Sequence, residues 1–214
     1  MSSADSELLP VRLRALRVPR YIRGMVTRYD YLRRLPRGHY QGDAFVHWSL
    51  TVQDRKIGWL TPAFSYKFRE LLTHTLFRYG LTCPVYCLMP DHLHMLWIGL
   101  FSNSDQLNAM KFIRRETNVV LQKLGYRFQA QAFDNVLSER DRRRDAFEEV
   151  CEYIARNPER NGQVPQDGYM DYRYTDCLVP GAPNLHFVTD DFWAAFWRVY
   201  YHTKGHGLTR AKSP

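Results

Sequence analysis

Acidic residues are scarce in this chain of 214 residues, where 22 Asp and Glu face 30 Lys and Arg, and the formal net charge is +8. The imbalance is steepest over residues 1–43, which hold nine arginines against Asp5, Glu7, Asp30 and Asp43. Arginine presents forked donors that suit phosphate oxygens. A basic chain of this kind favours nucleic acid as a partner, although a merely soluble basic surface would have the same composition.

Long apolar runs are also absent. No stretch of about 18 apolar residues occurs, so we expect no transmembrane helix and no membrane partner. Residues near the start include Asp5 and Glu7 and no apolar stretch, so we expect no secretory signal. The pair Arg33-Arg34 is not followed by an apolar stretch either, which argues against a twin-arginine signal.

Cysteine is rare, and the four that occur make no CxxC pair. Cys83, Cys87, Cys151 and Cys177 fall in periodic segments, where a small buried side chain is the expected role. Nothing in their spacing indicates disulfides, which favours a cytoplasmic protein.

The hydrophobic pattern predicts an α+β protein with a ferredoxin-like, split βαβ core, an antiparallel sheet and flanking helices. Strands are expected over residues 44–53, 84–89, 91–99 and 132–137, and helices over 62–79, 104–124 and 144–157. We divide the chain into a basic arm (1–43), a central domain (44–175) and an aromatic, basic extension (176–214). Within the extension, residues 190–202 have the spacing of a helix whose aromatic side chains pack on the core.

His92 and His94 are the most informative residues. Separated by Leu93 in a β-like segment, they project from one face of a strand, close enough to hold one metal ion. A satisfied structural pair, or the metal site of an unrelated hydrolase, would place two histidines in the same way.

Tyr153 is the second candidate. At about 100° per residue it lies on the flank of the apolar stripe of its expected helix, beside Glu149 and Asn157, one turn before and after it. Glu149 is interpreted as a solvated helix residue. An unperturbed phenol has a pKa of about 10 and is a weak nucleophile at neutral pH, so it needs a neighbouring positive charge to attack a phosphate.

Two runs carry a resemblance to a known family. The run from Tyr86 to Leu96, YCLMPDHLHML, resembles the histidine–hydrophobe–histidine signature of the single-tyrosine HUH transposases. The run from Tyr153 to Gly162, YIARNPERNG, is similar to the tyrosine helix of that family, especially in its REP-associated tyrosine transposases. The resemblance spans residues 44–174.

This resemblance implies the HUH endonuclease fold, with His92 and His94 as metal ligands, Tyr153 as nucleophile and Asn157 as the residue that completes the metal site. It implies a Mg²⁺ or Mn²⁺ ion, single-stranded or hairpin DNA as partner, and a monomer or homodimer. The implied reaction cleaves single-stranded DNA to a 5′-phosphotyrosine and a free 3′-hydroxyl, then rejoins strands. A catalytically silent, domesticated DNA-hairpin-binding protein of the same fold is the alternative.

The sequence departs from the family pattern at Asp91, where the family often has Asn. Asp91 could orient His92 as an acceptor or merely shape the corner before the strand. Four arginines before the tyrosine helix are candidate phosphate contacts, although a solvated loop is the simpler reading: Arg140, Arg142, Arg143 and Arg144. His47 is expected to be a satisfied histidine of the core or rim.

Overall fold

The computed structural model describes residues 33–206. The chain divides into two units, Met1–Tyr31 and Leu32–Pro214, and the described residues all belong to the second. Most of the expected basic arm therefore lies outside the described residues. Among residues 33–206, no helix is both long enough and apolar enough to cross a membrane.

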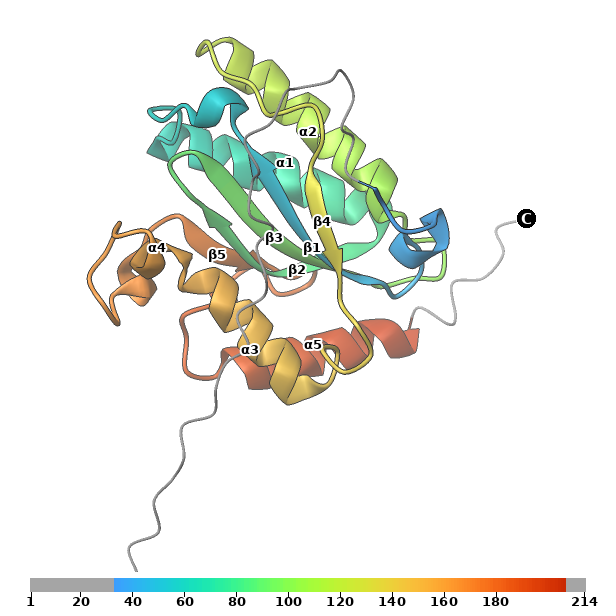
Figure 1. The fold of residues 1–214 in the computed structure, drawn as a ribbon. Helices are drawn as coiled ribbons and strands as arrows, with labels where there is room; N and C mark the ends of the chain where they lie inside the picture. The colour runs from blue at the N-terminus through green and yellow to red at the C-terminus, as the bar shows by residue number, and fades with distance from the viewer. Residues whose placement is uncertain (1–32, 207–214) are drawn as a thin grey trace, which may run out of the picture. The chain divides into compact units, whose positions relative to one another are not determined.

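Five antiparallel strands form one sheet in the order β4-β1-β3-β2-β5 (Figure 1). Their bounds are Phe45–Thr51 (β1), Leu81–Leu88 (β2), His92–Gly99 (β3), Phe133–Val136 (β4) and Thr175–Leu178 (β5). With α1 after β1 and α2 after β3, the chain order β1-α1-β2-β3-α2-β4 is that of the ferredoxin-like split βαβ motif. The predicted α+β class, with an antiparallel sheet and flanking helices, is confirmed.

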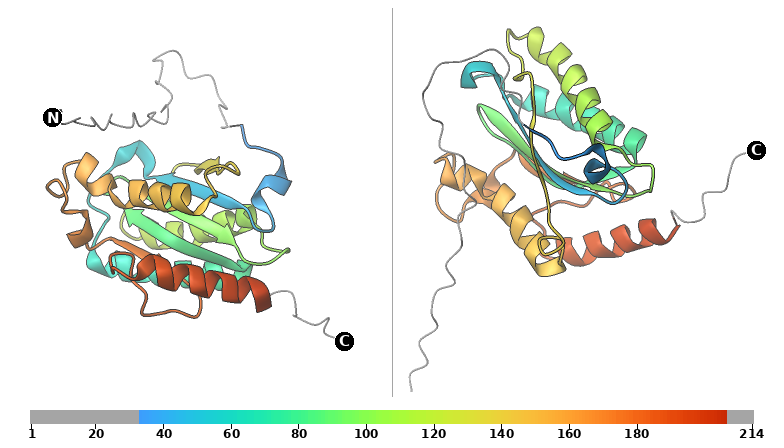
Figure 2. Two further views of the ribbon diagram at one scale, coloured as in Figure 1. Left: turned by 90° about the horizontal axis from the view of Figure 1, so that it is seen from below. Right: turned by 45° about the vertical axis from the view of Figure 1, so that its right-hand side comes forward.

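Helices cover both faces of this sheet. Helices α1 (Pro62–Tyr79) and α2 (Gln106–Gln122) lie together on one face, and α3 (Arg144–Ala155) and α5 (Phe192–His206) lie on the other (Figures 1 and 2). The remaining helical segments are short: α4 (Asn157–Arg160), η1 (Arg37–Tyr40), η2 (Gln53–Arg55) and η3 (Tyr169–Asp171).

Strand alternation divides the interior into two cores. In β3, Leu93, Met95 and Trp97 belong to the core under α1 and α2, whereas Leu96 and Ile98 belong to the core under α3 and α5. Because successive side chains of a strand point to opposite faces, His92 and His94 share the α3 face with Leu96. The histidine pair is therefore on the same side of the sheet as the helix that carries Tyr153.

Helix α1 begins and ends where the sequence predicts. The Thr61 hydroxyl accepts a hydrogen bond from the Phe64 amide (3.1 Å), Pro62 occupies the first turn, and Gly80 ends the helix in the left-handed conformation with φ 62°. These start and stop signals are local, so the pattern of residues alone is sufficient to place both ends.

Strand β2 begins at Leu81, three residues earlier than predicted. Pro84 lies inside it and has no N–H to donate to a neighbouring strand. The pairing with β3 shifts register between Thr82 and Val85, and the pairing with β5 shifts between Cys83 and Tyr86. These register shifts accommodate Pro84. The strand therefore includes Pro84 in its interior, although the sequence predicted that it begins there.

The segment after Gly162 contributes more structure than predicted. β5 was not expected, and it pairs with β2 along the edge of the sheet. The predicted aromatic helix is present as α5, where Phe192, Phe196, Trp197 and Tyr200 are buried against the α3 core. All four cysteines are buried and free, which confirms their predicted role as small core side chains.

Gln106 connects the first turn of α2 to the sheet. Its amide oxygen accepts a hydrogen bond from Trp48 Nε1 (3.0 Å), and its amide nitrogen donates to the Ala44 carbonyl (2.7 Å). Gln106 and Trp48 are fully buried, so groups that lost these partners could not turn to water.

We therefore expect Gln106→Leu to lower the free energy of unfolding by about 2–4 kcal/mol, because it leaves a buried donor and a buried acceptor unpaired. Urea unfolding followed by circular dichroism measures this loss. The matched control is Gln122→Leu on the exposed end of the same helix, which should stay within about 0.5 kcal/mol of wild type. Equal midpoints for the two variants would contradict the role given to Gln106.

Candidate functional site

His92 and His94 lie at the start of β3 with their rings close together. The two Nε2 atoms are 3.0 Å apart, and the rings meet nearly edge to face, with an interplanar angle of 88°. Both side chains are partly buried at the margin of the α3 core. The predicted pair is thus brought together, with one nitrogen of each ring directed at the same small volume.

Asp91 contacts Nδ1 of His92, the ring nitrogen that does not face His94. Its Oδ1 lies 2.6 Å from His92 Nδ1, and its Oδ2 accepts a hydrogen bond from Arg55 Nη1 (2.7 Å). Burial alone would raise the pKa of the Asp91 carboxyl, but the hydrogen bonds from His92 and Arg55 outweigh it and lower that pKa. A carboxylate at this position holds the proton of His92 on Nδ1 and leaves Nε2 free to bind another group.

His94 is held in its neutral form. Burial lowers the pKa of His94 well below its usual value, and the neighbouring His47, His92 and Arg160 lower it further. A third histidine, His47 of β1, touches it on the other side, with His47 Nε2 3.0 Å from His94 Nδ1. Sequence periodicity put His47 in the core or rim, but its contact with His94 follows only from the pairing of β1 with β3.

The donor set would suit one divalent ion. Imidazole nitrogens are common metal ligands, and the two Nε2 atoms, 3.0 Å apart, are close enough to hold a single ion together. Within residues 33–206, no group of three or more His, Cys, Asp and Glu side chains is arranged to hold a metal ion. An ion on His92 and His94 would thus complete its shell with amide, phosphate or water oxygens.

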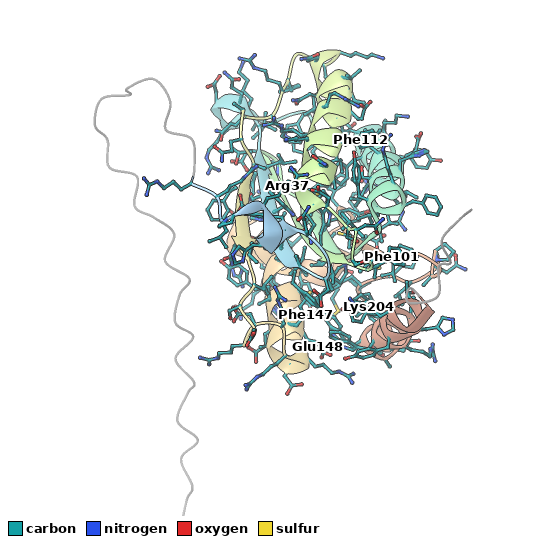
Figure 3. The ribbon with its side chains drawn as sticks, turned by 90° about the vertical axis from the view of Figure 1, so that its right-hand side faces the viewer. Arg37, Phe101, Phe112, Phe147, Glu148 and Lys204 are labelled. Carbon is teal, nitrogen blue, oxygen red and sulfur yellow. The ribbon has the colours of Figure 1, made fainter. Side chains whose placement is uncertain are left out.

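Tyr153 lies on α3, on the flank of the buried stripe formed by Phe147, Cys151 and Ile154. Those three side chains are fully buried, whereas Tyr153 is 40% exposed. The helix is fixed from outside by α5, where Trp197 Nε1 donates a hydrogen bond to Glu148 Oε1 (2.7 Å). Figure 3 shows Phe147 and Glu148 on α3 beside the helix that carries Lys204. Tyr153 is therefore carried by a helix that packs against both the sheet and α5, and its side chain is partly exposed to solvent.

The sequence predicted that the tyrosine helix runs to Asn157, and this end is wrong by two residues. α3 ends at Ala155, and Asn157 begins the four-residue helix α4. Pro158 causes the break, because it has no N–H to bond the Ile154 carbonyl one turn earlier. Asn157 Nδ2 supplies that donor, to the carbonyls of Ile154 (2.9 Å) and Tyr153 (3.2 Å). Asn157 is therefore buried beside Tyr153 and caps its helix.

Arg160 lies against the tyrosine. Its guanidinium carbon lies 3.6 Å from the centroid of the Tyr153 ring, and Nη1 donates to the Tyr153 carbonyl (2.8 Å). Its positive charge is also one of the smaller causes of the lowered pKa of His94. A positive charge therefore lies over the Tyr153 ring, on the side of the sheet that carries the histidine pair. The Asn-Pro-x-Arg spacing contains Arg160, but its position over the ring depends on the turn between α3 and α4.

Arg156 holds that turn in place. Its side chain donates to Glu152 (2.9 Å), which belongs to α3, and to Glu159 (3.0 Å), which belongs to α4. Its guanidinium also lies 4.4 Å from the centroid of the Tyr169 ring. This network fixes α4 against α3, which in turn fixes the position of Arg160.

The arginines predicted to contact DNA lie at the other end of α3, with Arg144 about 13 Å along the helix from Tyr153. Arg142 donates to the Leu137 carbonyl (3.2 Å) and covers the Phe45 ring, and Arg144 pairs with Glu148 (3.0 Å). Arg140 and Arg143 are exposed. The structure therefore does not bring these four side chains into contact with the histidines or the tyrosine.

Comparison with known proteins finds similarity at the level of the fold. No protein-family model matches the chain, and no curated protein matches it either. Among solved structures, one that is similar is described as a REP-associated tyrosine transposase bound to a REP hairpin. It shares 16% sequence identity over 70% of this chain and 82% of that chain, with a TM-score of 0.55. The described part of this chain therefore has the fold of a REP-associated tyrosine transposase.

Proposed function

We propose that this chain cleaves and rejoins single-stranded DNA, with Tyr153 as the nucleophile and a divalent metal ion held by His92 and His94. The observation that carries the proposal is that Tyr153, with Arg160 over its ring, lies on the helix that covers the sheet face of His92 and His94. This arrangement supports binding of one phosphate by the tyrosine, the arginine and the histidine pair together.

Asn157 is the proposed third protein ligand, through its side-chain oxygen, since its nitrogen is engaged by the end of α3. Imidazole nitrogens beside an amide oxygen suit Mn²⁺, and added phosphate and water oxygens suit Mg²⁺, so both ions are compatible with this set. When bound, such an ion neutralises charge on the scissile phosphate and on the departing oxygen.

The reaction is a transesterification. The Tyr153 oxygen attacks the phosphorus, the bond from phosphorus to the 3′-oxygen breaks, and the phenol proton is balanced by the proton on the released 3′-hydroxyl. The fragment on the 3′ side of the break stays joined to Tyr153 through its 5′-phosphate, as a phosphotyrosine ester. Because one phosphodiester replaces another, a second 3′-hydroxyl can reverse the step and rejoin strands without a nucleotide cofactor.

Arg160 has two tasks in this scheme. Stacked on the phenol, it restricts the ring to one side of the α3–α4 turn, and its remaining donors can bond the phosphate oxygens. A guanidinium is suited to both, because it is flat and always charged. The positive charge also balances the negative charge that develops as the phosphate is attacked.

The proposed substrate is single-stranded or hairpin DNA. The net charge of +8 supports a polyanionic partner, and the similar solved structure was determined with a REP hairpin. Arg140, Arg142, Arg143 and Arg144 are the proposed contacts to phosphates beyond the cleavage point. Free, buried cysteines fit a reducing compartment, and we propose that the protein acts in the cytoplasm.

Tyr153 should be required for the covalent step. Incubation with labelled hairpin and single-stranded oligonucleotides and Mn²⁺ should yield a covalent protein–DNA adduct on a denaturing gel. Tyr153→Phe should reduce adduct formation by on the order of 10³-fold or more, because the attacking oxygen is gone, while DNA binding is kept. Chelation of the metal ion should remove the adduct as well.

Tyr66→Phe is the matched control, because Tyr66 is an exposed tyrosine on α1, across the sheet from the site, and its removal should leave the adduct unchanged. An adduct that persists in Tyr153→Phe would remove Tyr153 from its role. Hairpin binding by the wild-type chain without any adduct, with either Mg²⁺ or Mn²⁺, would favour the silent DNA-binding protein instead.

Arg160 should accelerate the cleavage step. Arg160→Ala should slow single-turnover cleavage by about 10²-fold at saturating protein, since one donor to a developing anion is lost. Arg160→Lys keeps the charge without the flat stacking surface and should give an intermediate rate. The matched control is Arg115→Ala, an exposed arginine of α2 on the far face. A rate for Arg160→Ala equal to that of the Arg115→Ala control would exclude Arg160 from the chemistry.

A further inference from the structure

His47 is a third histidine on the sheet face that carries the proposed metal pair. In the pairing of β1 with β3, His47 lies opposite Leu96 and Ser49 lies opposite His94, so His47 is a diagonal neighbour of His94 on the same face. Its Nε2 is 3.0 Å from His94 Nδ1, and the two ring centroids are 5.1 Å apart with an interplanar angle of 37°. The contact has the geometry of a hydrogen bond between two imidazoles.

His47 lies on β1 between the buried side chains of Val46 and Trp48, surroundings that favour an uncharged imidazole. A neutral imidazole carries one N–H and one acceptor nitrogen. His47 can therefore accept a hydrogen bond through Nε2 without bringing a second charge into the site.

The bond from His94 to His47 determines which nitrogen of His94 is free. When His47 Nε2 accepts, the proton of His94 sits on Nδ1, and His94 Nε2 presents its lone pair toward His92 Nε2, 3.0 Å away. When the bond runs the other way, the proton sits on His94 Nε2, and that nitrogen cannot bind a metal ion. Only the first arrangement gives two free Nε2 atoms directed at one point.

The two histidines of the pair are thus supported in the same manner by different groups. Asp91 Oδ1, 2.6 Å from His92 Nδ1, orients the first ring, and His47 Nε2 occupies the equivalent place behind the second. Groups that accept a hydrogen bond from the far nitrogen of a metal-binding histidine fix its tautomer and its ring orientation. His47 comes from β1, so the support of His94 depends on the sheet and not on the local sequence around the pair.

We propose that His47 is a positioning residue of the metal site, which accepts the Nδ1 proton of His94 and thereby leaves His94 Nε2 free beside His92 Nε2. The inference rests on the proposed function in one respect, namely that His92 and His94 hold a metal ion. It does not depend on cleavage of DNA or on Tyr153.

The test compares two replacements of similar length in the full chain. Gln can place an amide oxygen near the position of the His47 Nε2 atom, whereas Met fills similar space with a thioether that is a weak acceptor. Mn²⁺ is titrated into each protein without DNA, and free Mn²⁺ is followed by its electron paramagnetic resonance signal. Binding at the site is the part that His92→Ala abolishes.

We expect His47→Met to weaken Mn²⁺ binding at this site by about 10–100-fold, and His47→Gln to recover most of the affinity, because the lost group is an outer acceptor. Ser49→Ala is the matched control, since Ser49 faces the same side directly opposite His94 and should leave the affinity unchanged. Unfolding midpoints of the variants, measured in parallel, separate loss of the site from loss of the fold.

Three results would count against the inference. Wild-type affinity in His47→Met would overturn it while leaving the metal pair intact. Equal weakening in His47→Gln and His47→Met, with normal unfolding midpoints, would show that ring packing rather than the hydrogen bond is required. A wild-type chain that binds Mn²⁺ no better than His92→Ala would overturn the metal part of the proposed function, and the role of His47 with it.

Discussion

The packing of α3 across the sheet is the interaction on which the site depends. Phe147, Cys151 and Ile154 are fully buried on that face, and the aromatic side chains of α5 cover them from outside. A helix held on one side in this way has a fixed rotation, so Tyr153, on the flank of the buried stripe, stands at the margin of the core. β3 brings His92 and His94 to the same face through strand alternation. The tyrosine helix and the histidines share one side of the sheet because both patterns are anchored in one apolar layer.

The polar groups at this margin form a continuous series that runs from Arg55 through Asp91, His92 and His94 to His47. Consecutive members are 2.6 to 3.0 Å apart. Polar groups removed from water are stable when they have partners, and here Asp91 orients the His92 ring and His47 orients the His94 ring. The lowered pKa values of His94 and His47 keep both rings uncharged, which an ion between His92 and His94 requires. The rigidity of this margin and the proposed metal affinity therefore have the same structural origin.

Local signals in the sequence were enough to predict α1 at both ends, the antiparallel pair β2–β3 and the placement of Tyr153 beside the core. Features that depend on distant residues were not predictable. β5 has four residues and exists through its pairing with β2, and His47 could be linked to His94 only once the register of β1 with β3 was known. Arg160 owes its place to the break at Pro158, where the expected helix of residues 144–157 ends two residues early. Arg142 covers the ring of Phe45, a residue of β1 that is distant in the sequence.

The most direct test of the account is a crystal structure of the full chain with Mn²⁺ and a single-stranded oligonucleotide, with the ion located by its anomalous scattering. The account predicts one peak bound by His92 Nε2 and His94 Nε2, with a phosphate between the ion and the Tyr153 oxygen and the Arg160 guanidinium beside it. A peak at other residues, or a phosphate bound on the opposite face of the sheet and away from Tyr153, would contradict the claim that these side chains form one DNA-cleaving site.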